Sequence, residues 1–245
     1  SNTELAGRDW AGFDISRVSF SGTVLRRCNM RGCKLPATVN ECDFSEADLS
    51  GSDMSQCDLE QVVLAGAVFS PATIFPRCMS NLELSGNNFA GCNLSGCDLT
   101  GSDLSSAILT DTNLSGAILS GVNFSGADLF ETALVGAKMD RCDFKNAKLP
   151  RNLQQGDLTG AQLSSLDLRK ADLTGANLTG ANLAQVQLDH ANLSHSILTK
   201  AKLPSSMPGV ILTEAKLPMS LVDADLREAD LRSCDLTGRD MKRAK

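Results

Sequence analysis

Residues 171–183 read ADLTGANLTGANL, so that a leucine recurs at every fifth position. Five residues turn an α-helix through about 500°, which leaves successive leucines roughly 140° apart around its axis. A β-strand alternates its faces with a period of two, so the same leucines would point to opposite faces in turn. Neither element keeps the leucines on one side, and the stretch therefore indicates a chain that turns a corner every five residues.

The repeating unit is a small residue, then Asp or Asn, then a large apolar residue, then two variable polar residues, which we number as positions one to five. Positions one to three form a short extended segment whose small and large residues face inward, and positions four and five turn the corner. Four such sides close a square coil of about 20 residues, with successive coils stacked about 4.8 Å apart. Because crossovers between parallel strands are right-handed, the sequence predicts an all-β, right-handed quadrilateral parallel β-helix of about 12 coils.

This unit resembles the A(D/N)LXX consensus of the pentapeptide-repeat family, and the resemblance covers essentially the whole chain. It implies the same β-helix fold, and it places the chain among bacterial proteins that include effectors injected into host cells. Some relatives mimic B-form DNA and bind DNA gyrase, which confers quinolone resistance. The consensus is matched at Ala47-Asp48-Leu49, Ala127-Asp128-Leu129, Ala171-Asp172-Leu173, Ala176-Asn177-Leu178 and Ala191-Asn192-Leu193.

The five-residue register changes at proline. Where Leu-Pro occurs, the next inward residue follows after four positions, and a shortened corner is expected because proline fixes φ and lacks an N–H. The segment SPATIFPRCM at residues 70–79 keeps the five-residue phase only if Arg77 points inside, so we expect an irregular loop there. The four shortened corners lie at residues 35–39, 149–153, 203–207 and 217–221.

Composition bounds the remaining possibilities. Hydrophobic residues make up 42% of the chain and aromatic residues 4%, which predicts one folded domain over residues 1–245 with a core of small and aliphatic side chains. No apolar run is long enough for a membrane span, and no secretory leader is visible. We expect a cytoplasmic location, in a bacterium or, for an injected effector, in its host. The chain begins at Ser1 without a methionine, which indicates a part of a longer protein.

The cysteines and histidines, which could bind a metal or catalyse a reaction in other proteins, fall at regular positions of the repeat. Eight of the nine cysteines occupy the small first position, which indicates buried, reduced thiols. Cys28 with Cys33 and Cys92 with Cys97 lie on adjacent sides and are the only candidate pairs for a disulfide or a metal. His190 and His195 occupy corner positions and no histidine accompanies the cysteines, so a zinc site is not predicted. We expect no catalytic residue, no cofactor and no metal.

Some outward positions of the repeat carry apolar residues instead of polar ones, and these departures indicate a candidate binding surface. Val68 and Ile108 replace the usual Asp or Asn at the second position, and Phe130 stands at a fourth position. With about 20 residues in a coil, the three share one side of the tube and form a candidate protein-binding surface. Val63, Ile118, Ile197 and Ile211 are further second-position exceptions. The sequence therefore predicts a non-catalytic protein-interaction scaffold, in one version the recognition arm of a secreted effector.

Acidic residues support a second hypothesis. Residues 41–122 carry a net charge of −10, against +3 for residues 1–40 and +1 for residues 123–245. Such a zone is compatible with a DNA mimic that inhibits or protects gyrase. In neither case is direct nucleic-acid binding expected, while the uncapped coils leave end-to-end self-association open. The acidic surface would consist of Asp43, Asp48, Asp53, Asp58, Asp98 and Asp103.

Overall fold

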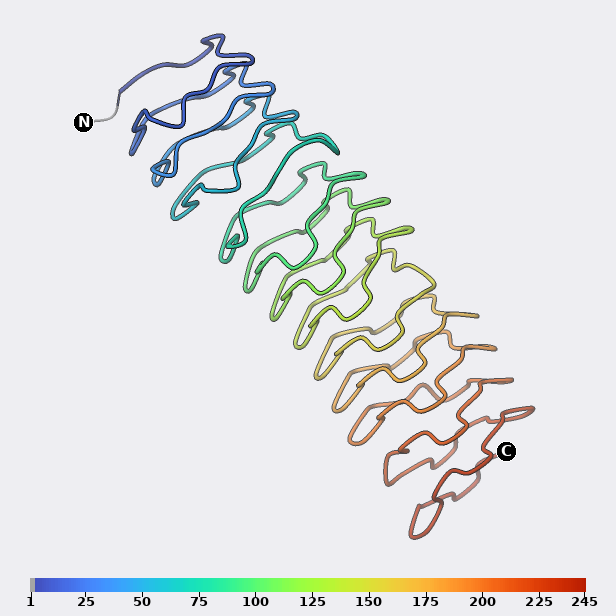
Figure 1. Cartoon of the computed structure of the whole chain (residues 1–245). Helices are drawn as coiled ribbons and strands as arrows, with labels where there is room; N and C mark the ends of the chain where they lie inside the picture. Colours follow the sequence, from blue (N-terminus) through green and yellow to red (C-terminus); the bar gives the residue numbers. More distant parts are fainter. Residues whose placement is uncertain (1–2) are drawn as a thin grey trace.

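The computed structural model describes residues 3–245, which wind into one elongated stack of coils with the two termini at opposite ends (Figure 1). Ser1 and Asn2 lie outside the described residues. Within residues 3–245 there is no helix, and the pairing between coils consists of single parallel bridges rather than longer strands. The bridges join residues one coil apart, at separations of 19 for Val24 and Asp43, 20 for Asp43 and Val63, and 21 for Asp53 and Ile74.

Main-chain hydrogen bonds connect each coil to both of its neighbours. The N–H of Asp48 donates to the carbonyl of Cys28 in the preceding coil (2.9 Å), and the N–H of Leu49 donates to Val68 in the following coil (2.8 Å). At the corner that precedes this side, the N–H of Ala47 donates to the carbonyl of Phe44 (2.9 Å) and closes a turn. This pattern recurs along the rod, so the main chain of a typical side is bonded in both axial directions.

Most regular corners place their fifth-position residue in the left-handed region of backbone conformation. Glu46 has a φ of 59° and Gly51 a φ of 67°. A positive φ at the third residue of a four-residue turn defines type II geometry, which glycine adopts without steric cost. Non-glycine residues occupy this conformation at many corners, and the reason is visible at Glu46, whose N–H donates to Ala65 of the next coil (2.9 Å). The hydrogen bond to the neighbouring coil therefore offsets the strain of a positive φ at a non-glycine residue.

The interior is a continuous column of third-position side chains. Phe44, Leu49 and Leu94 have no measurable exposure, and the small first-position residues fill the space between them. Aromatic rings one coil apart stack directly, as with Phe124 and Phe144, whose ring centres lie 5.2 Å apart. The core is therefore a single column of stacked side chains that runs along the axis of the rod.

The segment 70–79 remains within the coil and differs from the loop that the sequence suggested. The buried Phe75 follows the buried Phe69 by six positions, and the buried Met79 follows Phe75 by four. Ile74 forms a bridge with Asp53. The extra residue of one side is thus offset by the shortened Phe-Pro corner that follows, and Arg77 is exposed instead of pointing inside.

Each of the four Leu-Pro sequences is followed by a buried residue four positions after the leucine. The proline occupies the shortened corner, and the next side then resumes the inward alternation. The buried residues that follow are Val39, Leu153, Met207 and Leu221.

Cysteine fits the first position because its thiol reaches a main-chain carbonyl of the preceding coil. The Sγ of Cys142 lies 2.9 Å from the oxygen of Leu119, and the Sγ of Cys42 lies 2.8 Å from that of Phe20. Burial raises the pKa of the Cys57 and Cys142 thiols to about 12. All nine cysteines are free, and Cys78, the one outside the first position, is exposed.

We expect one cysteine to differ from the rest in reactivity. With a disulfide-exchange reagent at neutral pH, Cys78 should react within the mixing time, whereas the buried thiols should react only as the rod opens, because burial disfavours their thiolates. Complete unfolding should release nine thiols. Rapid reaction of two or more thiols in a Cys78→Ser variant would contradict this arrangement.

Candidate functional site

The three apolar residues proposed from the sequence lie on one side of the rod. Val68, Asn88, Ile108 and Asp128 form successive parallel bridges, so they occupy neighbouring coils in one ladder. Phe130 follows Asp128 by two residues at the adjoining corner. The exposed fractions are 49% for Val68, 42% for Ile108 and 57% for Phe130. We call these three residues the apolar ladder.

Polar neighbours interrupt and bound the apolar ladder. Asn88 separates Val68 from Ile108. Below Ile108, the Nζ of Lys148 lies 2.9 Å from a carboxylate oxygen of Asp128, and this hydrogen bond lowers the pKa of Asp128. The ladder is therefore an apolar strip between satisfied polar groups, which is the composition of many protein-binding patches.

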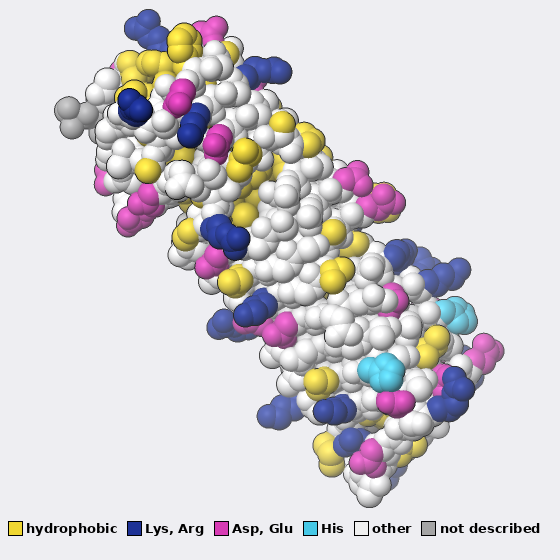
Figure 2. Space-filling view, viewed as in Figure 1, with side chains coloured by type: hydrophobic (Ala, Val, Ile, Leu, Met, Phe, Trp, Pro, Cys, Tyr) yellow, Lys and Arg dark blue, Asp and Glu magenta, His cyan; other side chains and the backbone are white. Residues whose placement is uncertain are grey.

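Other outward apolar residues lie on other sides or are less exposed. Val63 bridges Asp43 on a separate ladder and is 44% exposed, whereas Ile118 and Ile197 are half-buried. Ile74 is exposed but was not singled out from the sequence, because the extra residue between Phe69 and Phe75 shifts it to an outward position. Figure 2 shows apolar side chains most densely gathered over the N-terminal part of the visible face, with charged side chains both there and along the rest of the rod.

The proposed acidic residues surround the rod instead of forming one face. Asp43, Asp48 and Asp53 bridge three different ladders, and Asp58 bridges Thr38 on the fourth. Successive second positions within a coil always point to successive sides. The carboxylates of residues 43–58 are therefore distributed around one coil, and Asp98 and Asp103 lie on two adjacent sides further along the rod.

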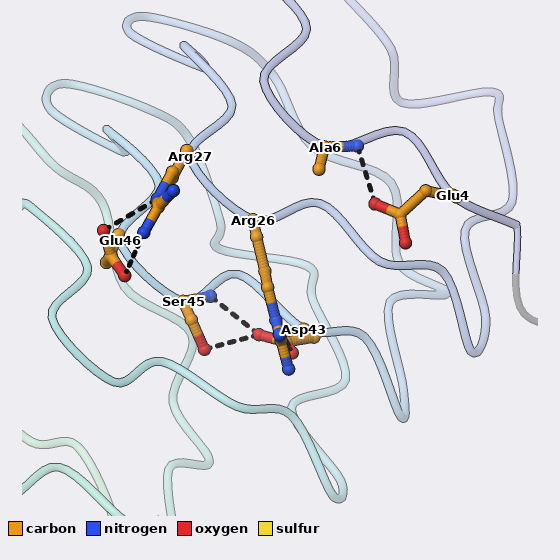
Figure 3. A network of polar contacts seen from close by, with 7 residues as sticks. All are labelled: Glu4, Ala6, Arg26, Arg27, Asp43, Ser45 and Glu46. Atoms are coloured by element: carbon orange, nitrogen blue, oxygen red, sulfur yellow. Dashed lines mark hydrogen bonds and ion pairs between the residues drawn. The ribbon is translucent and has the colours of Figure 1, made fainter.

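Basic residues of the first coils neutralise the start of the acidic zone. Arg26 donates to Asp43, and Arg27 makes two hydrogen bonds of 2.9 and 3.2 Å to Glu46 (Figure 3). Arg31 lies 3.4 Å from Asp48. The positive charge of residues 1–40 and the negative charge that follows are thus partly paired across coils. Among the described residues, the members of the proposed acidic surface without an ion pair are Asp53, Asp58, Asp98 and Asp103.

The second-position Asp and Asn residues have a structural role that the sequence analysis did not assign. The side-chain oxygen of Asp53 accepts the N–H of Ser55 at 3.0 Å, and that of Asn113 accepts the N–H of Ser115 at 3.0 Å. This is the Asx arrangement, in which a short polar side chain bonds the main chain two residues on. The preference for Asp and Asn therefore reflects the corner as well as exposure to solvent.

A groove of about 640 Å³, which the sequence pattern did not predict, lies beside Phe130. Leu134, Val135 and Pro150 give it an apolar lining, while Arg151 contributes a charged group at its rim. Val135 is 54% exposed. One sequence signal was available: Ala133 stands at a second position without the side-chain oxygen that bonds the main chain two residues on.

The histidines occupy corners, as their repeat positions indicate. His190 and His195 have φ values of 56° and 59°, and the Nδ1 of His195 lies 3.3 Å from a carboxylate oxygen of Glu214. Throughout residues 3–245, no three His, Cys, Asp or Glu side chains are grouped closely enough to hold a metal ion. Over the same range, no helix has the length and apolar character of a membrane span.

Comparison with known families agrees with the repeat. The family model for pentapeptide repeats matches with eight copies over residues 1–35, 42–72, 78–105, 107–146, 152–180, 176–206 and 219–245. No curated protein sequence matches the chain.

Two solved structures match the chain at low sequence identity. A trypsin-treated variant of QnrB1, a plasmid-mediated fluoroquinolone resistance protein, matches with a TM-score of 0.57 and 16% identity over 96% of this chain and 90% of that one. HetL, involved in heterocyst differentiation regulation in the cyanobacterium Nostoc sp. strain PCC 7120, matches with a TM-score of 0.44 and 26% identity over 95% and 89%. The repeats and the likeness to QnrB1 identify the fold as a right-handed β-helix.

We expect the rod to lose stability in acid because folding lowers the pKa of many corner carboxylates. The side-chain and main-chain hydrogen bonds of Ser55 lower the pKa of Asp53, and hydrogen bonds from Arg232 lower that of Asp230 to about 2. Stabilisation by a carboxylate of lowered pKa is present above its unfolded value, near 4, and is lost as the pH falls through the folded value. The melting temperature should therefore fall between about pH 4 and pH 2.

An Asp53→Asn variant keeps the oxygen that accepts the Ser55 N–H but does not titrate. It should show a smaller acid-induced loss of melting temperature than the parent. Equal losses in the two proteins would contradict a contribution from this carboxylate.

Proposed function

The chain belongs to the pentapeptide-repeat family, and with that membership as the premise we propose that it is a non-catalytic scaffold for protein–protein interaction. The scaffold is a four-sided rod of about 12 coils, roughly 58 Å long at the usual strand spacing. It acts as the recognition arm of a bacterial secreted effector and meets its protein partner in the host cytoplasm. Solenoids suit this function because their stacked units present extended, rigid surfaces.

One observation supports this function above the others: the apolar ladder is exposed on a single side. Val68, Ile108 and Phe130 occupy positions where a polar residue would serve solubility better. At about 4.8 Å per coil, Val68 and Ile108 are about 10 Å apart, which suits one element of a partner. Binding sites concentrate their free energy in a few such buried anchors, so this strip is the proposed contact.

The alternative is a DNA-mimicking inhibitor or protector of DNA gyrase. It is supported by the net charge of −10 over residues 41–122 and by the likeness of fold to QnrB1, a fluoroquinolone resistance protein. Pairing of Asp43 with Arg26 and of Asp48 with Arg31 weakens the negative field at one end of that zone. We therefore prefer the apolar ladder as the working surface.

Two substitutions distinguish the proposals. Ile108→Asp places a charge on the apolar ladder and leaves the inward side chains unchanged, so folding should persist while binding to a partner recovered by affinity capture weakens by about 2 kcal/mol or more. Asp58→Lys reverses a carboxylate that has no ion pair within the described part of the chain, and under this proposal it should have little effect. Titration calorimetry with the captured partner measures both affinities.

Val63→Asp is the matched control, because Val63 is a second-position residue of similar exposure on another side of the rod. It should bind like the parent. If Asp58→Lys abolishes binding while Ile108→Asp does not, and parental binding weakens steeply with salt, the gyrase-type acidic surface replaces the apolar ladder.

A further inference from the structure

On the side of the rod that carries Ala133, the bonding between two successive coils is interrupted. Asn113 pairs with Ala133 and Asn152 pairs with Asp172 through parallel bridges on this side. Between Ala133 and Asn152 the described residues form neither a bridge nor a main-chain hydrogen bond. The N–H of Leu134, which at most third positions donates to the following coil, has no main-chain acceptor, and neither has that of Asn152. The equivalent N–H groups after the other proline corners also lack one, those of Thr38, Cys78, Ser206 and Ser220.

The interruption continues around the corner to the adjacent side. Lys148 bridges Asp128 above it, but the described residues show no bridge from Lys148 to Asp167 below. The N–H of Leu149, which at an ordinary third position donates to the following coil, likewise has no main-chain acceptor. Leu149 is only partly buried, unlike most third-position residues. Two sides that meet at one corner therefore share one opening.

The groove of about 640 Å³ occupies this opening. Phe130 precedes the interrupted side in the chain and Val135 follows it, and both side chains are more than half exposed. Leu134, Leu149 and Pro150 line the space between the two coils. The opening thus combines apolar walls with main-chain donors that lack acceptors.

Other proline corners also lose bridges to the preceding coil: the described residues show none between Asp58 and Cys78, between Gln187 and Ser206, or between Lys202 and Ser220. The corner at residues 35–39 keeps more of its bonding. At the matched corner of residues 35–39, Lys34 bridges Asp53 of the following coil, whereas Lys148 forms no such bridge with Asp167. Ser19 and Thr38, the equivalents of Ala133 and Asn152, likewise form no bridge. The N–H of Phe20 still donates to Thr38 (3.1 Å), and the Thr38 hydroxyl lies 3.2 Å from that of Ser19 in the preceding coil. At residues 149–153 the equivalent neighbour is Ala133, which has no polar side chain to offer Asn152. The groove therefore lies at a corner where the bridges and these cross-coil bonds are absent together.

We propose that the groove binds an extended peptide segment of a partner protein by adding it to the interrupted main-chain ladder. An extended peptide supplies carbonyl groups for the amides of Leu134, Leu149 and Asn152, which is how strand addition to an open sheet edge gains affinity. It also places an apolar side chain between Phe130 and Val135. The inference rests on the proposed function, since it names the form in which a protein partner binds.

Charges at the rim define the sequence of that segment further. Arg169 makes hydrogen bonds of 3.0 and 2.8 Å to the carboxylate of Asp167, and Arg151 lies 3.8 Å from the same carboxylate. Two guanidinium groups thus share one carboxylate and leave a surplus positive charge. Glu131 lines the groove and has no ion pair among the described residues. The matching peptide carries an apolar residue flanked by one acidic and one basic residue.

The test is a selection from a displayed library of random peptides about eight residues long, enough to span one side and both corners. The target is the full chain, with counter-selection against Ala133→Asn. That variant restores the Asn found at position 113 of the same ladder, so it should fold normally while its side chain caps the Val135 N–H and occupies the groove. Selected peptides should contain an apolar residue between opposite charges and bind Ala133→Asn at least about tenfold more weakly.

Two further comparisons make the expected result specific. N-methylation of alternate peptide residues should weaken binding to the parent about tenfold or more, because it disrupts main-chain pairing on one edge of the peptide. Val63→Asn, the same type of change on another side, should bind the peptides like the parent. So should Ile108→Asp, which lies outside the groove, and this separates failure of the peptide site from failure of the apolar ladder.

The proposal is overturned if the selection yields no peptide, or only peptides that bind Ala133→Asn as tightly as the parent. Two other outcomes also overturn it. If the parent dimerises in sedimentation equilibrium and Ala133→Asn does not, the occupant is a second copy of the chain. If indole saturates the groove in nuclear magnetic resonance titrations while no peptide binds, the site takes a small apolar molecule.

Discussion

The rod depends on main-chain hydrogen bonds between one coil and the next. Each side spans only about three residues, too few to be stable alone, so its donors and acceptors must find partners in the coils above and below. The bond from Asp48 to Cys28 and the bond from Leu49 to Val68 show how one side uses both neighbours. Stability in such a molecule is a sum of nearest-neighbour contacts along one axis.

The same bonding explains which residues the corners accept. The left-handed φ of the fifth position favours glycine, yet Glu46 and His195 occupy it because the coils on either side fix the main chain. Asp and Asn at the second position add a local bond to each corner, and cysteine at the first position reaches a carbonyl of the previous coil. The Asp, Asn and cysteine residues of the repeat thus contribute hydrogen bonds to the scaffold.

Function in this arrangement is expected where the regular pattern is broken. The apolar ladder breaks it chemically, since Val68 and Ile108 replace polar residues without disturbing the bridges. The groove beside Phe130 breaks it physically, since the bridges themselves are missing between Ala133 and Asn152. Both meet at Phe130, so this part of the rod offers a partner an exposed strip and an adjacent opening.

The sequence by itself determined the fold, because a five-residue period is compatible with so few geometries that the ADLTGANLTGANL stretch indicates the β-helix directly. It also placed Val68, Ile108 and Phe130 on one side, since the ladder position of a residue follows from counting. A regular five-residue count did not describe residues 70–79. There a spacing of six between inward residues is followed by a spacing of four, and the two offset each other. Counting did not reveal the groove either: the Leu-Pro corners at 35–39 and 149–153 look alike in sequence, yet of the two only the second is followed by a side without a main-chain bond to the preceding coil. Whether two stacked main chains come within hydrogen-bonding distance depends on the side chains of both coils, and the tertiary structure alone decided that.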